Sequence, residues 1–346
     1  LWPTTAAPDG VYGRAGDGPS GLALLSAQAE KGALQADVPR PASAANPPSP
    51  ASPPVTAVAE PFLPEVAEAA CTTLLPRLPG LSRAQCVATR LQASGALSRQ
   101  GAPLYWRDVP SHAGAAAKGQ PDAEPLRVLV VGAMHGDELT AASLALRWIG
   151  MAAAEGAVDA GEPAPVHWRF IPVLNPDGLL APKPTRVNAG GVDLNRNFPT
   201  PGWAEEAPVY WEKRTRKDPR RWPGHTPLSE PESRFLHQQM DQFQPQLVVS
   251  IHAPYGVLDF DGPHDPPLRL GRLRMDKLGV FPGSLGHYGG LHRGVPVVTI
   301  ELEHALRMPP DAEVRAMWRD LRHWMNTRLL DGADAVAGVK PPGLQR

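Results

Sequence analysis

The chain has 346 residues, of which 42% are hydrophobic, 34 are Lys or Arg, and 35 are Asp or Glu. This length and hydrophobic content allow one large domain or two smaller ones with a sizeable core, so disorder throughout is excluded. The formal net charge of -1 provides no general attraction for nucleic acid or for an anionic membrane. No apolar run reaches the roughly 18 residues that span a bilayer, so we expect neither a nucleic-acid partner nor a membrane span.

The first 108 residues are predicted to contain two segments of different character. Residues 1–60 are rich in Ala, Pro, Ser and Gly, and we expect a disordered tether because this composition buries too little apolar surface to offset chain entropy. Residues 61–108 are predicted as a helical hairpin segment that carries Cys71 and Cys86 on its two helices. A disulfide between them would close a loop of about 15 residues and stabilise the fold by roughly 3 kcal/mol. Two buried reduced thiols are the alternative.

Residues 109–335 are predicted as the main domain, with a tail over 336–346. Short β-branched runs indicate buried strands, and apolar residues at helical spacing indicate helices. A capping box at Ser229–Glu232 is expected to open one helix. The predicted fold is a mixed, mainly parallel sheet with helices on both faces. In chain order the elements are strand 126–131, helix 138–153, strand 166–173, a turn at 175–178, a polar excursion to about 226, a helix ending near 243, strands 246–251 and 295–302, and helix 311–330.

Two histidines and one carboxylate lie where these elements meet. His135 follows strand 126–131, Glu138 falls in the first turn of the next helix, and His252 directly follows strand 246–251. The carboxyl ends of strands in open α/β sheets are where sites form. Two His and one Glu form a known ligand set of catalytic zinc, which needs three protein ligands and one position left for water. We therefore expect one zinc ion at His135, Glu138 and His252.

Several ordered motifs between residues 126 and 330 resemble the zinc carboxypeptidase family. They are His-x-x-Glu at 135, Asn-Pro-Asp-Gly at 175, Arg186, Gly-Val-Asp-Leu-Asn-Arg-Asn at 191, Ser-Ile-His at 250, and a Glu on a late strand. The resemblance implies that the three ligands bind zinc and that Glu301 is the general base and acid. It also implies that Arg186, Asn195 and Arg196 handle substrate charge.

The chemistry of these side chains agrees with the implied roles. A carboxylate such as Glu301 can take a proton from water and return it to a leaving nitrogen. Arg186 would stabilise an oxyanion, and Arg196 with Asn195 would hold a substrate carboxylate. Glu303 competes with Glu301 for the role of base, but Glu301 matches the family's position after the apolar run 297–300.

Segments after His252 resemble the bacterial murein peptide amidase branch of the family, whose members cut the γ-D-glutamyl to meso-diaminopimelate bond in cell-wall peptides. The loop Asp259–Pro263 is acidic, and we expect Asp259 or Asp261 to bind the ammonium group of diaminopimelate. Tyr288 is the only nearby candidate for the mobile tyrosine of the family's carboxypeptidases. The resemblance implies a hydrolase acting on peptidoglycan-derived peptides.

Three other functions stay open. The chain could be a metallocarboxypeptidase acting on protein or peptide C-termini, an N-acyl amino acid deacylase, or an inactive zinc-binding cell-wall module. The Pro/Ala tether and the cysteine pair favour a periplasmic or otherwise exported protein of a bacterium. Related amidases that recycle wall peptides make the cytoplasm the alternative.

Overall fold

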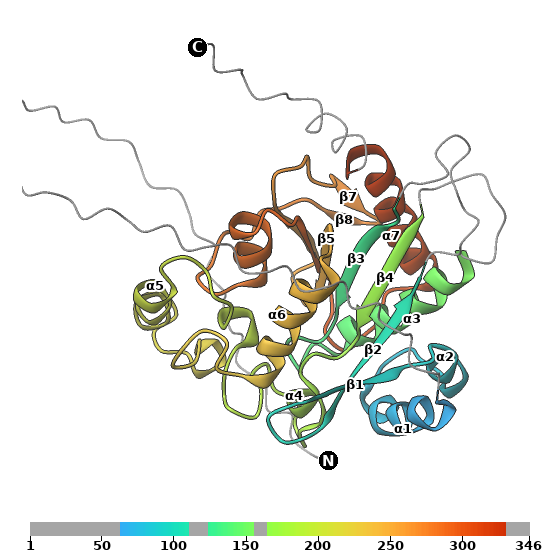
Figure 1. Cartoon of the computed structure of the whole chain (residues 1–346), viewed down its shortest axis with the longest axis horizontal. Coiled ribbons are helices and arrows are strands. Elements are labelled where there is room, and N and C mark those ends of the chain that lie inside the picture. Colours follow the sequence, from blue (N-terminus) through green and yellow to red (C-terminus); the bar gives the residue numbers. More distant parts are fainter. Residues whose placement is uncertain (1–62, 111–123, 156–164, 330–346) are drawn as a thin grey trace, which may run out of the picture. The chain divides into compact units, whose positions relative to one another are not determined.

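The computed structural model describes residues 63–110, 124–155 and 165–329 (Figure 1). The predicted tether at 1–60 and the predicted tail at 336–346 lie outside these residues. The strands are β1 (Gln92–Leu97), β2 (Pro103–Val109), β3 (Leu126–Val131), β4 (Val166–Ile171), β5 (Leu247–His252), β6 (Val257–Asp261), β7 (Arg269–Leu270), β8 (Leu273–Arg274) and β9 (Val297–Glu301). The helices are α1 (Pro64–Leu74), α2 (Arg83–Ala88), α3 (Leu139–Glu155), α4 (Pro176–Leu180), α5 (Trp203–Val209), α6 (Pro231–Phe243) and α7 (Asp311–Trp324). Short helical turns are η1 (Leu75–Arg77), η2 (Leu194–Arg196), η3 (Tyr210–Arg214), η4 (Pro219–Arg221), η5 (His287–His292) and η6 (Met325–Leu329).

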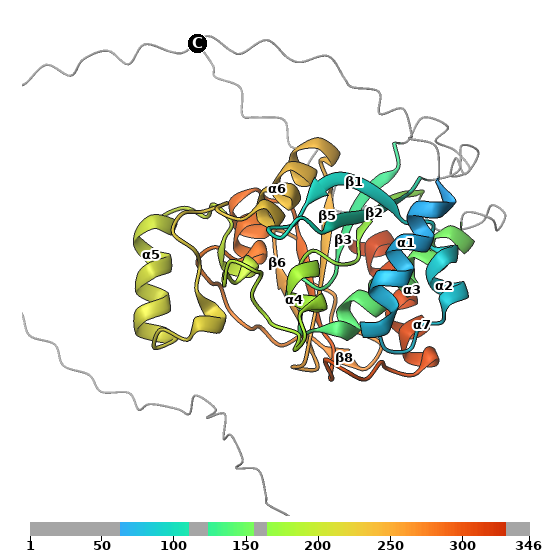
Figure 2. The same cartoon turned by 90° about the horizontal axis from the view of Figure 1, so that it is seen from below.

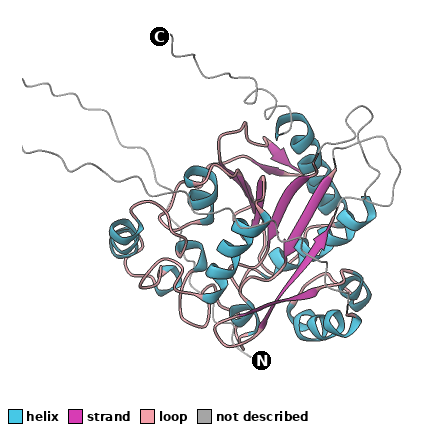
Figure 3. Cartoon of the chain, viewed as in Figure 1, coloured by secondary structure: helices cyan, strands magenta, loops and turns pink. Residues whose placement is uncertain are grey.

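Seven of these strands form one mixed sheet in the order β1-β2-β4-β3-β5-β9-β6. The four central strands β4, β3, β5 and β9 run parallel, and the outer strands pair antiparallel (Figure 3). The predicted mixed, mainly parallel sheet is therefore confirmed. Parallel neighbours bring the carboxyl ends of β3, β5 and β9 to one edge, where sites form in sheets of this kind.

Helices cover both faces of the sheet, as the sequence predicts (Figure 2). On one face, α3 and α7 pack against Val128, Val249 and Ile300 in a single hydrophobic cluster. On the other face, α6 and η5 pack against Val131 and Val248. Side chains alternate between the faces along each strand, so both faces of the central strands are buried.

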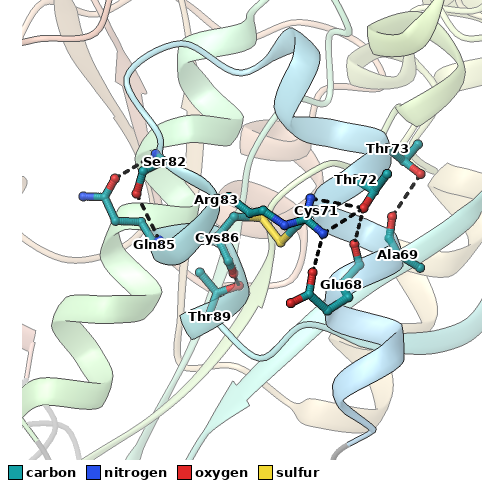
Figure 4. The surroundings of a disulfide bond; sticks show 10 residues. All are labelled: Glu68, Ala69, Cys71, Thr72, Thr73, Ser82, Arg83, Gln85, Cys86 and Thr89. Carbon is teal, nitrogen blue, oxygen red and sulfur yellow. Dashed lines mark hydrogen bonds and ion pairs between the residues drawn. A yellow bond between two sulfur atoms is a disulfide. The ribbon is translucent and has the colours of Figure 1, made fainter.

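The N-terminal helices form a disulfide-linked hairpin. Cys71 of α1 and Cys86 of α2 are bonded to each other and are fully buried (Figure 4). Ser82 caps α2 in a capping box with Gln85, whose backbone N–H donates to the serine hydroxyl oxygen. The predicted disulfide is confirmed.

Three details of the expected elements are wrong. Residues 92–109 form β1 and β2, so the predicted helical segment 61–108 is helical only in its first half. These strands escaped prediction because β1 contains small and polar residues instead of a β-branched run. Helix α6 has Glu230 at its N-cap with no side-chain cap, so the capping box expected from Ser229 does not form. Glu138 lies directly before α3 instead of inside its first turn.

Candidate metal centre and active site

The loop after β3 places His135 at the carboxyl edge of the sheet. This loop packs against the start of α4, because a Cβ on Gly136 would come within 2.3 Å of the backbone carbon of Gly178. Helix α4 is itself fixed by Asn175, whose side-chain oxygen accepts from Gly178 N–H at 2.9 Å. Any larger residue at 136 would push His135 away from the sheet edge.

His135, Glu138 and His252 converge in one buried cluster. The Nδ1 atoms of the two imidazoles lie 3.1 Å apart, and the Glu138 carboxylate lies 2.8 Å from Nδ1 of His135 and 3.1 Å from Nδ1 of His252. All three ligand atoms lie within 4.8 Å of one another. The structure therefore brings together the three residues that the sequence predicts as metal ligands.

The outer partners of the two imidazoles indicate which nitrogen holds the proton. Nε2 of His135 lies 3.1 Å from the Asp193 carboxylate, and Nε2 of His252 lies 2.8 Å from the Ser250 hydroxyl. A proton on each Nε2 leaves both Nδ1 lone pairs directed toward the carboxylate of Glu138. Three acceptors that face one another need a cation between them, and two nitrogens with one oxygen suit zinc. The donor set fits the expected metal.

Arg186 lies beside this cluster and shares its outer carboxylate. Its Nε and Nη2 each lie 3.0 Å from Oδ2 of Asp193, and its Nη1 lies 3.5 Å from Oε1 of Glu138. Asp193 thus binds the arginine with one oxygen and His135 with the other. Asp193 therefore links Arg186 to the predicted ligand His135.

Glu301 is the last residue of β9 and the register partner of His252 on β5. Register partners on neighbouring strands project to the same face, so Glu301 lies next to the metal cluster. The side chain is buried at 7% exposure, and its Oε2 has no hydrogen-bond partner among the described residues. Glu303 lies beyond the strand and is exposed, which favours Glu301 over Glu303 as the base.

The environments of Glu138 and Glu301 push their pKa values in opposite directions. Burial alone would raise the pKa of Glu138, but His135 and His252 hold it well below its usual range. Burial raises the pKa of Glu301, and the nearby Glu138 carboxylate adds to this effect. A carboxyl with a raised pKa transfers protons near neutral pH, whereas one with a lowered pKa stays ionised as a ligand.

Arg196 and Asn195 lie in η2, on the loop between the ligands. Arg196 is 4% exposed, its guanidinium stacks on the ring of Phe281 at 4.6 Å, and its Nε has no partner among the described residues. Asn195 accepts a hydrogen bond from Leu285 N–H at 2.8 Å through its side-chain oxygen. Both residues therefore lie against the segment 281–285.

Asp259 and Asp261 lie on the edge strand β6 and not in the loop expected from sequence. Val257 pairs with Glu301 and Asp259 with Thr299, so the two aspartates share the face of the sheet that carries Glu301. Burial raises the pKa of Asp259, and burial together with the Asp259 charge raises the pKa of Asp261 to about 6. Lys277 is the cation that opposes both shifts.

Tyr288, expected to take part in substrate binding, is a core residue in the structure. The side chain is 3% exposed, stacks on Phe198, and accepts a hydrogen bond from Arg293 through its hydroxyl oxygen at 2.9 Å. Its ring also stacks on His237 of α6, so η5 directs this side chain into the core.

The sequence interpretation overlooked Ser250, whose hydroxyl contacts Nε2 of the predicted metal ligand His252. It lies two residues before His252 on the same strand, and alternation along a strand places both side chains on one face. The Ser-x-His spacing on one strand was therefore the signal in the sequence that could have identified Ser250 as a partner of His252.

A mainly parallel sheet with two imidazoles and a carboxylate at its carboxyl edge, and a buried acid on the adjacent strand, defines the metallohydrolase class of site. The sequence profile of the zinc carboxypeptidase family matches residues 88–261, about half of the chain. The chain belongs to the zinc carboxypeptidase family, and zinc is the metal of that family.

Comparisons with individual proteins agree with this family. Murein peptide amidase A of Escherichia coli K12 is 34% identical over 164 residues, which cover 46% of this chain and 57% of that protein. Murein peptide amidase A of Vibrio campbellii is 33% identical over 146 residues, which cover 37% and 54%. The chain thus spans somewhat over half the length of these curated relatives. Carboxypeptidase A of Helicoverpa armigera has the same fold, with a TM-score of 0.53 and 16% identity over 79% of this chain and 81% of that one.

No helix within the described ranges is long and apolar enough to cross a membrane.

Proposed function

We propose that this protein hydrolyses an amide bond in cell-wall peptides, namely the γ-D-glutamyl to meso-diaminopimelate bond. The observation that carries the proposal is the placement of Glu301 beside His252: it is buried, and its Oε2 has no hydrogen-bond partner in the part of the chain that the structure describes. The curated relatives named murein peptide amidase A support the choice of substrate class.

Zinc bound to His135, Glu138 and His252 would lower the pKa of a coordinated water to about 7 and polarise the scissile carbonyl. Glu301 takes the proton from the attacking water and returns it to the leaving nitrogen. One carboxylate serves both steps, because it can hold the proton between them. Arg186 donates to the carbonyl oxygen as negative charge develops on it.

Groups of opposite charge would hold the substrate. Diaminopimelate carries, at its second amino-acid centre, both an ammonium and a carboxylate. Arg196 with Asn195 would bind the carboxylate, and Asp259 or Asp261 would bind the ammonium.

The test is incubation of zinc-loaded protein with L-Ala-γ-D-Glu-meso-diaminopimelate, followed by mass spectrometry of the products. We expect release of free diaminopimelate, and the matched lysyl tripeptide should be cut more slowly. A panel of peptides ending in Phe or Lys and a set of N-acyl amino acids separate the alternatives. Faster release of C-terminal Phe would favour an ordinary carboxypeptidase, and hydrolysis that survives exhaustive chelation would contradict the metal mechanism.

We also propose that the protein acts outside the cytoplasm. The buried Cys71–Cys86 disulfide supports this, because such bonds persist in oxidising compartments. Thiol trapping of the protein in its bacterial host, followed by cell fractionation, should find the oxidised form in the periplasm or medium. Recovery of reduced protein from the cytoplasm would contradict this location.

A further inference from the structure

A buried acidic cluster contacts the loop between Arg186 and Asp193, and it contains neither a predicted metal ligand nor the proposed base. Glu230 and Glu232, at the start of α6, are 3% and 0% exposed. Both carboxylates converge on one amide, because Nδ2 of Asn188 donates to Oε2 of Glu230 at 2.7 Å and to Oε2 of Glu232 at 3.0 Å. Acidic residues suit a helix N-terminus, but that preference does not explain why both meet at a single asparagine.

The turn between β1 and β2 completes this cluster. The guanidinium of Arg99 donates to Oε2 of Glu230 at 2.9 Å, and the backbone N–H of Arg99 donates to Oε1 of Glu232 at 2.9 Å. Gly190 also packs here, since a Cβ on it would lie 2.8 Å from the Glu230 carboxylate. Both carboxylate oxygens of Glu232 therefore accept a hydrogen bond, one from Arg99 and one from Asn188.

Asn188 connects the cluster to a loop with both ends in the site. Its side-chain oxygen accepts from Gly190 N–H at 2.9 Å and from Val192 N–H at 3.1 Å, which closes the turn between Arg186 and Asp193. Asp193 has a separate backbone anchor, because its N–H donates to the carbonyl of Trp222 at 2.8 Å. The Arg186 backbone is held by Asn175 at 3.2 Å. Each end of the loop therefore has its own backbone anchor, and Asn188, two residues after Arg186, fixes the turn between them.

We propose that Asn188, Glu230 and Glu232 form a positioning cluster that holds Arg186 at the reacting centre. This inference rests on the proposed function, in which Arg186 stabilises the oxyanion. None of the three side chains touches a ligand of the metal. They act through the loop, so they are positioning residues and not catalytic ones.

A double-mutant cycle between Asn188→Ala and Arg186→Ala tests the proposal. With Arg186 present, Asn188→Ala should lower kcat about 10- to 100-fold, because a misplaced charge stabilises the transition state poorly. KM and zinc affinity should change less than about twofold. In the Arg186→Ala background the same substitution should change kcat less than about twofold, since the group it positions is gone. An equal loss in both backgrounds would overturn the proposal.

A second variant and a matched control separate positioning from stability. Glu232→Gln keeps the shape but turns an amide N–H₂ toward a donor, and it should lower kcat in the same direction as Asn188→Ala. Asp108→Asn breaks the bidentate pair with Arg169 between β2 and β4, away from the loop, and should lower Tm without changing kcat. A kcat that follows Tm across all of these variants would show that the cluster only stabilises the fold.

A binding readout decides the proposal even if no murein peptide is hydrolysed. Inorganic phosphate, an oxyanion that requires no peptide subsite, is titrated into each zinc-loaded variant. Asn188→Ala should weaken phosphate binding about tenfold when Arg186 is present and have no effect when it is absent. If the peptide is not hydrolysed but Asn188→Ala still weakens phosphate binding only when Arg186 is present, the proposed function is contradicted and the positioning cluster is not. If Asn188→Ala weakens phosphate binding equally with and without Arg186, the positioning cluster is contradicted.

Discussion

His252 and Glu301 are register partners on the adjacent parallel strands β5 and β9, so a metal ligand and the proposed base stand side by side on one face of the sheet. The hydrogen bonds of the sheet fix the relative position of these two residues, so their placement does not depend on loop movement. Sites carried on strands hold their geometry closely, which a proton transfer between positioned groups requires.

Replacement of Glu301 by Gln should abolish most turnover without loss of the metal. The amide keeps the size of the side chain but cannot accept a proton, so kcat should fall by about 10²- to 10⁴-fold. Metal analysis after dialysis should find one zinc per chain in wild type and variant alike. Activity near the wild-type level would exclude Glu301 as the base and redirect attention to Glu303.

The outer partners of the two histidines should differ in their effect on zinc. Asp193→Asn removes the carboxylate that orients His135 and also frees Arg186, so zinc affinity should fall about 10- to 100-fold. Ser250→Ala removes only a neutral hydroxyl from His252 and should weaken zinc less. Competition with a chromophoric chelator measures both. The reverse ranking would mean that His252 is the more dependent ligand.

Substrate affinity should fall in acid as Asp261 becomes neutral. Its pKa is raised to about 6, first by burial and then by Asp259. Above that pH the carboxylate is ionised and would attract the ammonium of the proposed substrate, and below it this attraction would be lost. KM for the diaminopimelyl tripeptide should therefore rise as the pH drops below about 6. Asp261→Asn should raise KM at neutral pH and flatten this acid limb, whereas an unchanged KM profile would remove Asp261 from the substrate site.

Loss of the Cys71–Cys86 disulfide should lower stability more than activity. The bond closes a loop of 15 residues in sequence separation, which corresponds to about 3 kcal/mol in the chain-entropy account. Denaturant unfolding of the Cys71→Ser/Cys86→Ser double variant, and of wild type under reductant, should both show this loss. The hairpin contributes no ligand, so kcat of the folded protein should stay the same. A large drop in kcat would show that the hairpin also shapes the site.

Removal of zinc should destabilise the fold as well as stop turnover. A ligand present at 100 times its Kd stabilises the native state by about 2.7 kcal/mol, provided that it does not bind the unfolded chain. Thermal unfolding with and without a chelator should show a lower Tm for the metal-free protein, restored by added zinc. An identical Tm would mean that the buried cluster of His135, Glu138 and His252 is equally stable without a cation.

The amino-acid sequence by itself determined the chemistry of the centre. The metal ligands and the central strands follow local patterns, because buried parallel strands are short apolar runs and polar residues at their carboxyl ends meet at one edge. Glu301 followed from the resemblance to the zinc carboxypeptidase family. Those signals are contained within a few residues of each position. They sufficed for His135, Glu138 and His252 and for the mixed sheet.

Only the tertiary structure decided which neighbours these residues have. Tyr288 lies near Glu301 in the chain, but its side chain is buried against Phe198. Asp259 lies farther from Glu301 in the chain, but strand pairing puts it on the face of the sheet that carries Glu301. Strand β1 has no β-branched pattern and forms through pairing with β2, and its turn supplies Arg99 to a cluster more than 80 residues away in sequence. Such contacts depend on cross-strand register and long-range packing, which no window of sequence contains.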